Sequence, residues 1–278
     1  GGKRVVEFRQ LVMALHKAGL RVGMDVVYNH TTTSGQKDSS VLDRSVPGYY
    51  QRLDANGVVE RSTCCDNTAT EHLMMGKLML DSVELWARQY RIDSFRFDLM
   101  GHQPRAAMEL LRTRVNASTG RDVNLIGEGW NFGEVADGRR FVQASQLSLN
   151  GSGIGTFSDR TRDAVRGGGP SDSGQALVEQ QGYINGLVYD RNEYAAERPL
   201  SDLMQAADLV RVGLAGSLRD FTLHTYQGST SRLDAIDYKG QPAGYVSEPA
   251  EVVNYVENHD NQTLFDNNAY KLPRSTSS

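Results

Sequence analysis

The segment Tyr90–His102, YRIDSFRFDLMGH, places a cation two residues before a carboxylate. Its apolar residues and short length predict a buried strand of about six residues. Since side chains alternate between the two faces of a strand, Arg96 and Asp98 share one face, whereas Phe95 and Phe97 share the other. A neighbouring arginine keeps a carboxylate ionised and fixes its orientation. This pattern fits a catalytic acid, and it also fits an ordinary structural ion pair.

Three further predicted strands, at residues 20–28, 123–126 and 251–256, also end in polar or acidic groups. The groups that follow them are Asn29 and His30, then Glu128, then His259 and Asp260. In a (β/α)8 barrel the carboxyl ends of the strands meet at one rim, so side chains from different strands line a single cleft. We therefore expect these groups and Asp98 to form one site. Taken singly, His30 also fits a surface histidine and Asp260 a turn residue.

Helical apolar spacing separates the predicted strands, and this alternation indicates an α/β fold with a parallel sheet. Helices are expected at residues 4–18, from a capping box at Thr68–Glu71 to residue 90, from Pro104 to residue 115, and at 200–214. Residues 153–157 are a weaker strand candidate. Residues 31–67 lack periodicity, and loops of this length are uncommon unless functional. We predict that they form a long loop excursion after the strand at 20–28.

Composition excludes several classes of partner. The chain has 278 residues, enough for one large α/β domain or two ordinary ones. The net charge of −4 is small and the basic residues are scattered, so we expect no nucleic-acid partner. No apolar run approaches the roughly 20 residues of a transmembrane helix, so we expect no membrane span in this chain.

The adjacent Cys64 and Cys65 are either free thiols or a disulfide between neighbours.

Four segments resemble, in order and spacing, the four motifs of the α-amylase superfamily of glycoside hydrolases. They are DVVYNH at 25–30, FRFD at 95–98, GEGW at 127–130 and VENHDN at 256–261. Within that superfamily, CCDNTA at 64–69, FDLMGH at 97–102 and HDNQTLFD at 259–266 are similar to type I pullulanases and limit dextrinases. Gly101 replaces the lysine that amylases usually carry there, whereas His102 is kept. Ser94 departs from the pattern, since the family normally has glycine at that position.

The resemblance implies a (β/α)8 TIM barrel with long βα loops. Residues 1–278 would be a partial catalytic barrel domain, covering about strands 3 to 7. We expect such a piece to leave bare strand edges and to be poorly active on its own. The resemblance also implies a secreted or cell-surface protein, although the chain itself carries no signal that gives the compartment.

For the three acids the resemblance implies separate roles. Asp98 would be the nucleophile that forms a covalent glycosyl-enzyme, and Glu128 would be the general acid and base. In a retaining glycosidase these two carboxyl groups lie about 5–5.5 Å apart. Asp260 would stabilise the oxocarbenium-like transition state and bind sugar hydroxyls.

The remaining predicted site residues would bind substrate. His30 and His259 would hydrogen-bond the sugar before the scissile bond, and His102 is placed beside them. Arg96 would keep the nucleophile ionised. Trp130 would line the cleft, where an apolar neighbour helps to keep the general acid protonated.

These roles predict a retaining hydrolase of α-1,6-glucosidic branch linkages in pullulan, amylopectin or limit dextrins. The alternatives are an α-1,4-acting amylase-like hydrolase and a non-catalytic glycan-binding homologue, and the presence of all three acids argues against the latter. No cofactor is required by this chemistry. Calcium is an option at Asn29 or Asp25, although further oxygen ligands cannot be placed from the sequence.

Overall fold

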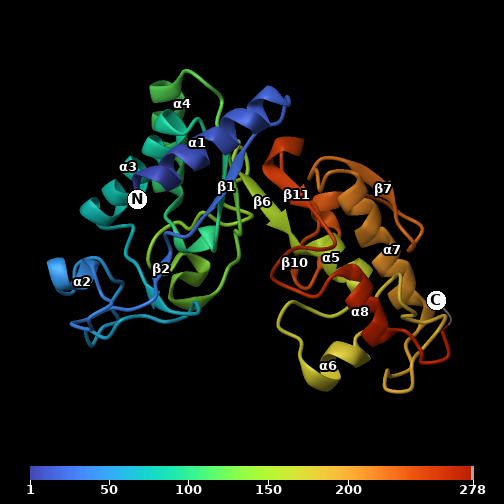
Figure 1. Ribbon diagram of the computed structural model, residues 1–278. Helices are drawn as coiled ribbons and strands as arrows, with labels where there is room; N and C mark the ends of the chain where they lie inside the picture. The colour runs from blue at the N-terminus through green and yellow to red at the C-terminus, as the bar shows by residue number, and fades with distance from the viewer. Residues whose placement is uncertain (277–278) are drawn as a thin grey trace. The chain divides into compact units, whose positions relative to one another are not determined.

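The computed structural model describes residues 1–276, which fall into two compact units, 1–156 and 157–276 (Figure 1). The strand order of the main sheet is β1-β4-β5-β6-β11, and the division between the units falls within β6. Parallel strands alternate with helices, which confirms the predicted α/β class. Closure into a barrel stays a prediction. Each unit is described below by itself.

Parallel pairing in the first unit aligns the carboxyl ends of neighbouring strands. The strands are β1 (Gly23–Val26), β4 (Ser94–Phe97), β5 (Asn124–Gly127) and β6 (Gly155–Ser158). Val26 is paired with Phe97, and Phe97 is paired with Gly127. The residues after these strands, Asp98 and Glu128 among them, therefore start from the same row of the sheet. The predicted six-residue strand around Arg96 is four residues long.

Alternation within β4 follows the predicted pattern. Phe95 and Phe97 are completely buried, whereas Ser94 and Arg96 are partly exposed. The two phenylalanines belong to the main hydrophobic core of this unit, together with Met79, Val83 and other apolar residues of the helices. Burying two aromatic rings on one face fixes which way the charged residues of β4 point.

The helical elements of the first unit are α1 (Gly2–Lys17), the short α2 (Leu42–Ser45), α3 (Leu73–Gln89), α4 (Arg105–Thr119), and the 3-10 segments η1 (Met100–His102) and η2 (Gly133–Gly138). Helices α1, α3 and α4 lie close to the predicted positions, whereas α2 and the 3-10 segments were not predicted. Figure 1 shows α1, α3 and α4 gathered together, and α3 packs against α4. Helix α4 is followed by Gly120, whose φ of 62° is the left-handed conformation that glycine adopts readily.

The capping-box prediction at Thr68–Glu71 is wrong. Helix α3 begins at Leu73 with His72 before it, and no side chain caps its first turn. The side chains of the expected box are used in tertiary contacts instead. Thr68 donates to the Tyr28 carbonyl, and Glu71 accepts from Arg52. A buried partner elsewhere in the chain therefore overrides the local capping signal.

The long segment at 31–67 contains little regular structure besides α2. It starts at β2 (His30–Thr31) and returns as β3 (Asp66–Asn67), and the two strands pair in antiparallel fashion with His30 opposite Asn67. This pairing brings the end of the segment back to the residues that follow β1.

Within residues 157–276, the second unit contains four helices and several short strands. The helices are α5 (Asp159–Arg166), α6 (Gly174–Glu179), α7 (Leu200–Leu214) and α8 (Leu264–Lys271), with 3-10 segments η3 (Leu233–Ala235) and η4 (Pro249–Glu251). The strands are β7 (Thr222–His224), β8 (Thr230–Arg232), β9 (Asp237–Tyr238), β10 (Gln241–Pro242) and β11 (Val252–Asn254). The predictions for β6, β11 and α7 are confirmed, whereas α5, α6 and α8 were not predicted.

Buried cations are a feature of the second unit. The guanidinium of Arg160 lies between the rings of Tyr238 and Tyr245, with its Cζ 5.0 and 4.6 Å from their centroids. Lys271 donates to the carbonyls of Gly167 and Gln180 at 2.8 and 2.6 Å, and burial lowers its pKa to about 8. Each cation is held by rings or carbonyl oxygens, as buried charges must be.

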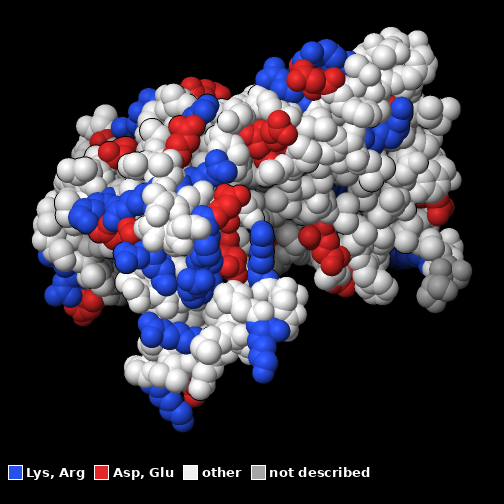
Figure 2. Space-filling view, turned by 90° about the horizontal axis from the view of Figure 1, so that it is seen from above, with Lys and Arg blue, Asp and Glu red and all other residues white. Residues whose placement is uncertain are grey.

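The surface carries both signs of charge. Figure 2 shows Lys and Arg interspersed with Asp and Glu on the face in view. In residues 1–276, the structure contains no helix that is both long and apolar enough to cross a bilayer.

Adjacent leucines on α4 provide a matched test of the core. Leu111 is 0% exposed and Leu110 is 56% exposed. We expect Leu111→Ala to lower the free energy of unfolding by about 2–5 kcal/mol, because it leaves a cavity. Leu110→Ala should change it by about 0.5 kcal/mol or less. Urea unfolding of both variants measures the difference, and equal losses would contradict this packing.

Candidate active site

The two predicted catalytic acids directly follow neighbouring strands. The amide of Asp98 donates to the Val26 carbonyl at 3.0 Å, and the amide of Glu128 donates to the Phe97 carbonyl at 3.1 Å. Both bonds extend the parallel ladders by one step. Backbone hydrogen bonds of the sheet therefore fix the backbone positions of both acids, independently of their side-chain contacts.

One guanidinium contacts three carboxylates at the ends of three strands. Arg96 Nη1 lies 3.0 Å from Asp25 Oδ1 and 3.1 Å from Asp98 Oδ1. Its Nη2 lies 3.1 Å from Glu128 Oε1. Although burial opposes the effect, the three carboxylates raise the pKa of Arg96 above its ordinary value. The predicted Arg96–Asp98 pair is present, and the same cation also holds Glu128.

The turn after Asp98 is tightly constrained. Leu99 adopts a left-handed conformation with φ 39° and ψ 49°, which is uncommon for a residue with a branched side chain. Its amide donates to Glu128 Oε2 at 2.8 Å, so the turn after one acid orients the carboxylate of the other. Sparsely populated backbone conformations of this kind are concentrated at functional sites.

Gly101 is required by the close approach of a second chain segment. A Cβ at this position would lie 2.3 Å from the Trp130 carbonyl oxygen. The Gly101 amide donates to the Glu128 carbonyl at 2.9 Å, and its own carbonyl accepts from Gln143 at 3.1 Å. The backbone after Asp98 and the backbone after Glu128 are thus in direct contact. Trp130 itself is partly exposed.

Asn29 links His30 to the proposed nucleophile. In the amide orientation that satisfies all its neighbours, Asn29 donates to Asp98 Oδ2 at 3.2 Å and to the Asp98 carbonyl at 3.1 Å. Its oxygen accepts from His30 Nδ1 at 2.9 Å. Asn29 is almost completely buried. The amide oxygen, which accepts from His30, is the atom of Asn29 that could bind calcium, and calcium there stays a prediction.

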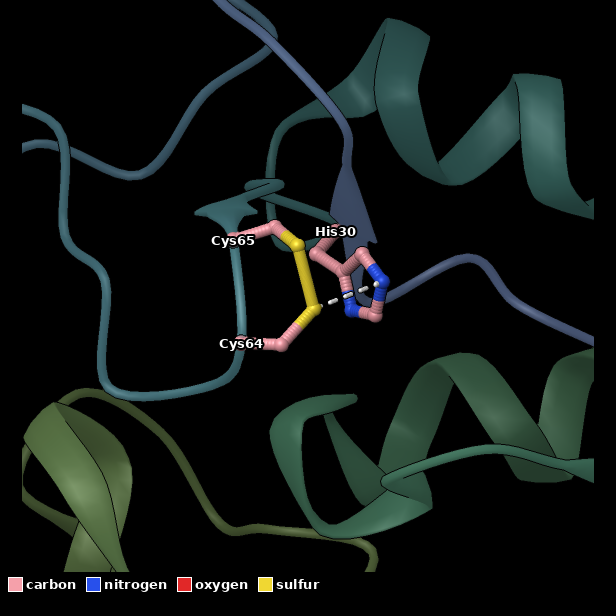
Figure 3. Close-up of side chains that lie close together, drawn as sticks. All are labelled: His30, Cys64 and Cys65. Atoms are coloured by element: carbon pink, nitrogen blue, oxygen red, sulfur yellow. Dashed lines mark hydrogen bonds between the residues drawn. A yellow bond between two sulfur atoms is a disulfide. The ribbon is translucent and has the colours of Figure 1, made fainter.

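A disulfide between sequence neighbours lies beside His30. Cys64 and Cys65 are joined, so of the two alternatives left open by the sequence the structure contains the disulfide. Figure 3 shows both cysteines next to the histidine ring, with Cys64 Sγ 3.4 Å from His30 Nε2. In residues 1–276, these three side chains form the one group of His, Cys, Asp and Glu whose ligand atoms could converge on a metal ion.

A buried ion network holds the 31–67 segment, and the sequence analysis missed it. Arg52, 2% exposed, donates to both carboxylate oxygens of Glu71 at 2.9 Å and to Glu134 Oε1 at 2.8 Å. It also donates to the His102 carbonyl at 3.0 Å. Arg52 lies in an aperiodic stretch, where no local pattern marks a buried cation.

Glu134 is the shared acceptor of this network. Ser62 donates to its Oε2, and Asn67 donates to its Oε1 at 2.9 Å. Although burial acts in the opposite direction, the hydrogen bonds from Ser62, Arg52 and Asn67 lower the pKa of Glu134 to about 2. The carboxylate is therefore ionised at neutral pH. Through Ser62 and Asn67 it links the residues on both sides of Cys64 and Cys65 to the segment after β5.

His102 belongs to the same network. Its Nε2 lies 3.0 Å from Ser62 Oγ, and its ring meets Phe132 edge-on at a centroid distance of 4.7 Å. The side chain is 1% exposed, so a direct contact with a sugar would require the network to open. Burial lowers the pKa of His102 from 6.5 to about 4, against the opposing charge of Glu134. The imidazole is therefore neutral at pH 7.

The other two predicted site residues belong to the second unit. His259 and Asp260 are exposed, and His259 Nε2 lies 3.2 Å from Asp260 Oδ1. The Asp260 amide donates to Asn258 Oδ1 at 3.2 Å, which is a local turn contact. Arg166 from α5 donates to the carbonyls of Val256 and Gln262 at 2.8 and 2.7 Å, so a buried cation supports both ends of the loop that carries Asp260.

Comparison with known proteins identifies the relatives of the chain. No family model matches it. It is 49% identical over 276 residues to a pullulanase of Klebsiella aerogenes, an alignment that covers 98% of the chain and 24% of that protein. The chain is a homologue of the pullulanases. It spans about a quarter of the length of this relative.

Further pullulanases agree with this assignment. The chain is 42% identical to the chloroplastic pullulanase 1 of Arabidopsis thaliana over 289 residues, which covers all of this chain and 30% of that protein. Among solved structures, the maltotriose complex of PulA from Klebsiella pneumoniae superposes with a TM-score of 0.92 and 48% identity. That match covers 98% of this chain and 29% of the PulA chain.

The low pKa of His102 predicts a pH effect on stability. Between pH 6.5 and about 4 the unfolded chain binds a proton at this residue and the folded chain does not. Stability should therefore rise with pH across this window, by on the order of 3 kcal/mol. Urea unfolding at a series of pH values should show this slope, and His102→Gln should reduce it. The ionised Glu134 also contributes to folding stability, and this contribution is lost at lower pH, as the pH falls from 4.5 to about 2.

Removing Arg52 should release the loop network. Arg52→Met leaves Glu71 and Glu134 without their cation, and we expect a loss of about 3–5 kcal/mol in unfolding free energy. Lys77→Met is a matched control, since it removes the exposed partner of Asp81 and should cost about 0.5 kcal/mol. Limited proteolysis should also cut residues 31–67 faster in the Arg52 variant. Similar losses in the two variants would mean that the buried network contributes little.

Proposed function

We propose that the complete protein is a retaining debranching hydrolase that cleaves α-1,6-glucosidic linkages in pullulan, amylopectin or limit dextrins. One observation carries the proposal: Asp98 and Glu128 follow neighbouring strands and share one arginine, in a chain that is 49% identical to a pullulanase. Two carboxylates held at adjacent strand ends are the arrangement that a double-displacement glycosidase needs.

In this proposal Asp98 attacks the anomeric carbon, and the glycosidic bond breaks as the glycosyl-enzyme ester forms. Arg96 and Asn29 keep the attacking carboxylate ionised and oriented. Glu128 gives a proton to the departing oxygen, and it then takes a proton from the water that hydrolyses the ester. The Leu99 amide holds Glu128 in position for both steps.

The remaining residues are proposed to bind the sugar or to support those that do. Asp260 and His259, both exposed, would contact the hydroxyls of the ring beside the scissile bond. His30 would accept through Nε2, because Nδ1 donates to the Asn29 amide oxygen. Trp130 would line the cleft next to Glu128. For the buried His102 we propose that any contribution to sugar binding acts through Ser62 and Glu134.

The rival within the same chemistry is an α-1,4-acting amylase-like hydrolase. Gly101 favours debranching, because amylases usually carry lysine there and this backbone has no room for a side chain. A non-catalytic glycan-binding protein is the second rival, and it would not need two acids held on one arginine.

Substitution of the two acids in the complete protein tests the proposal. We expect Asp98→Asn and Glu128→Gln each to lower kcat on pullulan by at least about 10³-fold, because each removes one half of the double displacement. Asp81→Asn, which changes an exposed acid on α3, should retain the wild-type rate. The first-formed reducing end should be the α-anomer by NMR. Wild-type turnover in Asp98→Asn would refute the assignment, and faster cleavage of linear amylose than of pullulan would favour the α-1,4 alternative.

A further inference from the structure

We propose that, once its neighbouring disulfide is reduced, the chain binds a soft divalent cation such as Zn²⁺ through His30, Cys64 and Cys65. The candidate ligand atoms of these side chains all lie within 4.8 Å of one another (Figure 3). Two thiolates and one imidazole are a ligand set that zinc accepts, with the fourth position left to water. Cys64 is exposed, so solvent and ion can reach the group.

The distances suit a single ion. With Zn–S bonds of about 2.3 Å and a Zn–N bond of about 2.0 Å, tetrahedral geometry places a ligating nitrogen about 3.5 Å from each sulfur and the sulfurs about 3.8 Å apart. His30 Nε2 already lies 3.4 Å from Cys64 Sγ. Breaking the disulfide lets the two sulfurs separate to the required distance with side-chain rotation.

A hydrogen bond at the other ring nitrogen of His30 prepares the histidine to act as a ligand. His30 Nδ1 donates to the Asn29 amide oxygen at 2.9 Å, so the lone pair of the neutral ring is on Nε2, the nitrogen that lies beside Cys64. Metal-bound histidines almost always donate their other ring N–H in this way. Asn29 is buried and also bonded to Asp98, which fixes the orientation of the ring.

The backbone around the cysteines is anchored on both sides. Ser62 and Asn67 flank the pair and both donate to the buried Glu134. Asn67 is also opposite His30 in the β2–β3 pair. Loss of the disulfide therefore leaves both thiols close to the histidine, so that little ordering remains to be done when the ion binds.

The chemistry has two balanced steps. A dithiol reductant passes two electrons and two protons to the Cys64–Cys65 bond and becomes a disulfide itself. Zn²⁺ then replaces the two thiol protons, which leave to solvent. The disulfide form has no thiolate and should not bind the ion. The binding stands independently of the proposed function, whereas its consequence, loss of a sugar contact at His30, rests on that function.

Metal titration of the 278-residue chain tests the inference. The chain is reduced with dithiothreitol, freed of reductant without oxygen, and titrated with Co²⁺ or Zn²⁺. We expect a thiolate-to-cobalt charge-transfer band that saturates at one ion per chain and is displaced by Zn²⁺. The oxidised chain and reduced Cys64→Ser/Cys65→Ser should lack the band. His30→Ala should weaken binding by about tenfold or more, whereas His224→Ala, outside the cluster, should not.

A variant-free measurement guards against misfolding of the substituted chains. Zn²⁺ should raise the Tm of the reduced wild-type chain and leave that of the oxidised chain unchanged, because only the reduced native state binds the ion. Absence of the band in the reduced wild type, equal binding by the serine variant, or undiminished binding by His30→Ala would each overturn the proposal. If Zn²⁺ binds as expected but Asp98→Asn keeps its activity in the complete protein, the proposed function fails and the metal site remains.

Discussion

The arrangement of the candidate active site depends on a single cation. Three carboxylates, from Asp25, Asp98 and Glu128, converge where β1, β4 and β5 end, and they would repel one another without Arg96 between them. The position of Arg96 is in turn set by burial, since Phe95 and Phe97 fill the opposite face of the same strand. Packing of two aromatic rings on one side of the sheet thus determines the electrostatics on the other.

Predictions from the sequence are confirmed where they rest on local patterns, and they fail where a contact joins residues that are far apart in the chain. Alternation in β4 and helical spacing in α7 are local, and both predictions are confirmed. Thr68 and Glu71 matched a local capping rule, yet their partners Tyr28 and Arg52 lie elsewhere in the chain. Helix α5 was missed for a related reason: its sequence is mostly charged, and rings and carbonyls distant in sequence make it possible to bury those charges.

In the candidate site, too, some features follow from general rules of the fold and others depend on particular contacts between distant residues. Proximity of Asp98 and Glu128 follows from strand ends in a parallel sheet, a rule that needs no knowledge of particular contacts. The contacts of His102 cannot be predicted from that rule, because its partners Ser62 and Glu134 come from an aperiodic loop and from a 3-10 segment. Since that loop, the cysteine pair and His102 all depend on the buried Glu134, we expect them to open together rather than independently.

The contact between Gly101 and Trp130 also bears on how this site can change over time. On the other side of the same turn, a Cβ at Gly127 would lie 2.7 Å from the Phe97 carbonyl and from Met100 Cβ. The chain segments around Asp98 and Glu128 therefore interlock at Gly101 and Gly127. A lysine of the amylase type cannot be grafted at position 101 by one substitution, because the neighbouring turn must be rebuilt in the same step. Exchange of this glycine for a lysine would therefore require coordinated changes in both segments rather than a single point mutation.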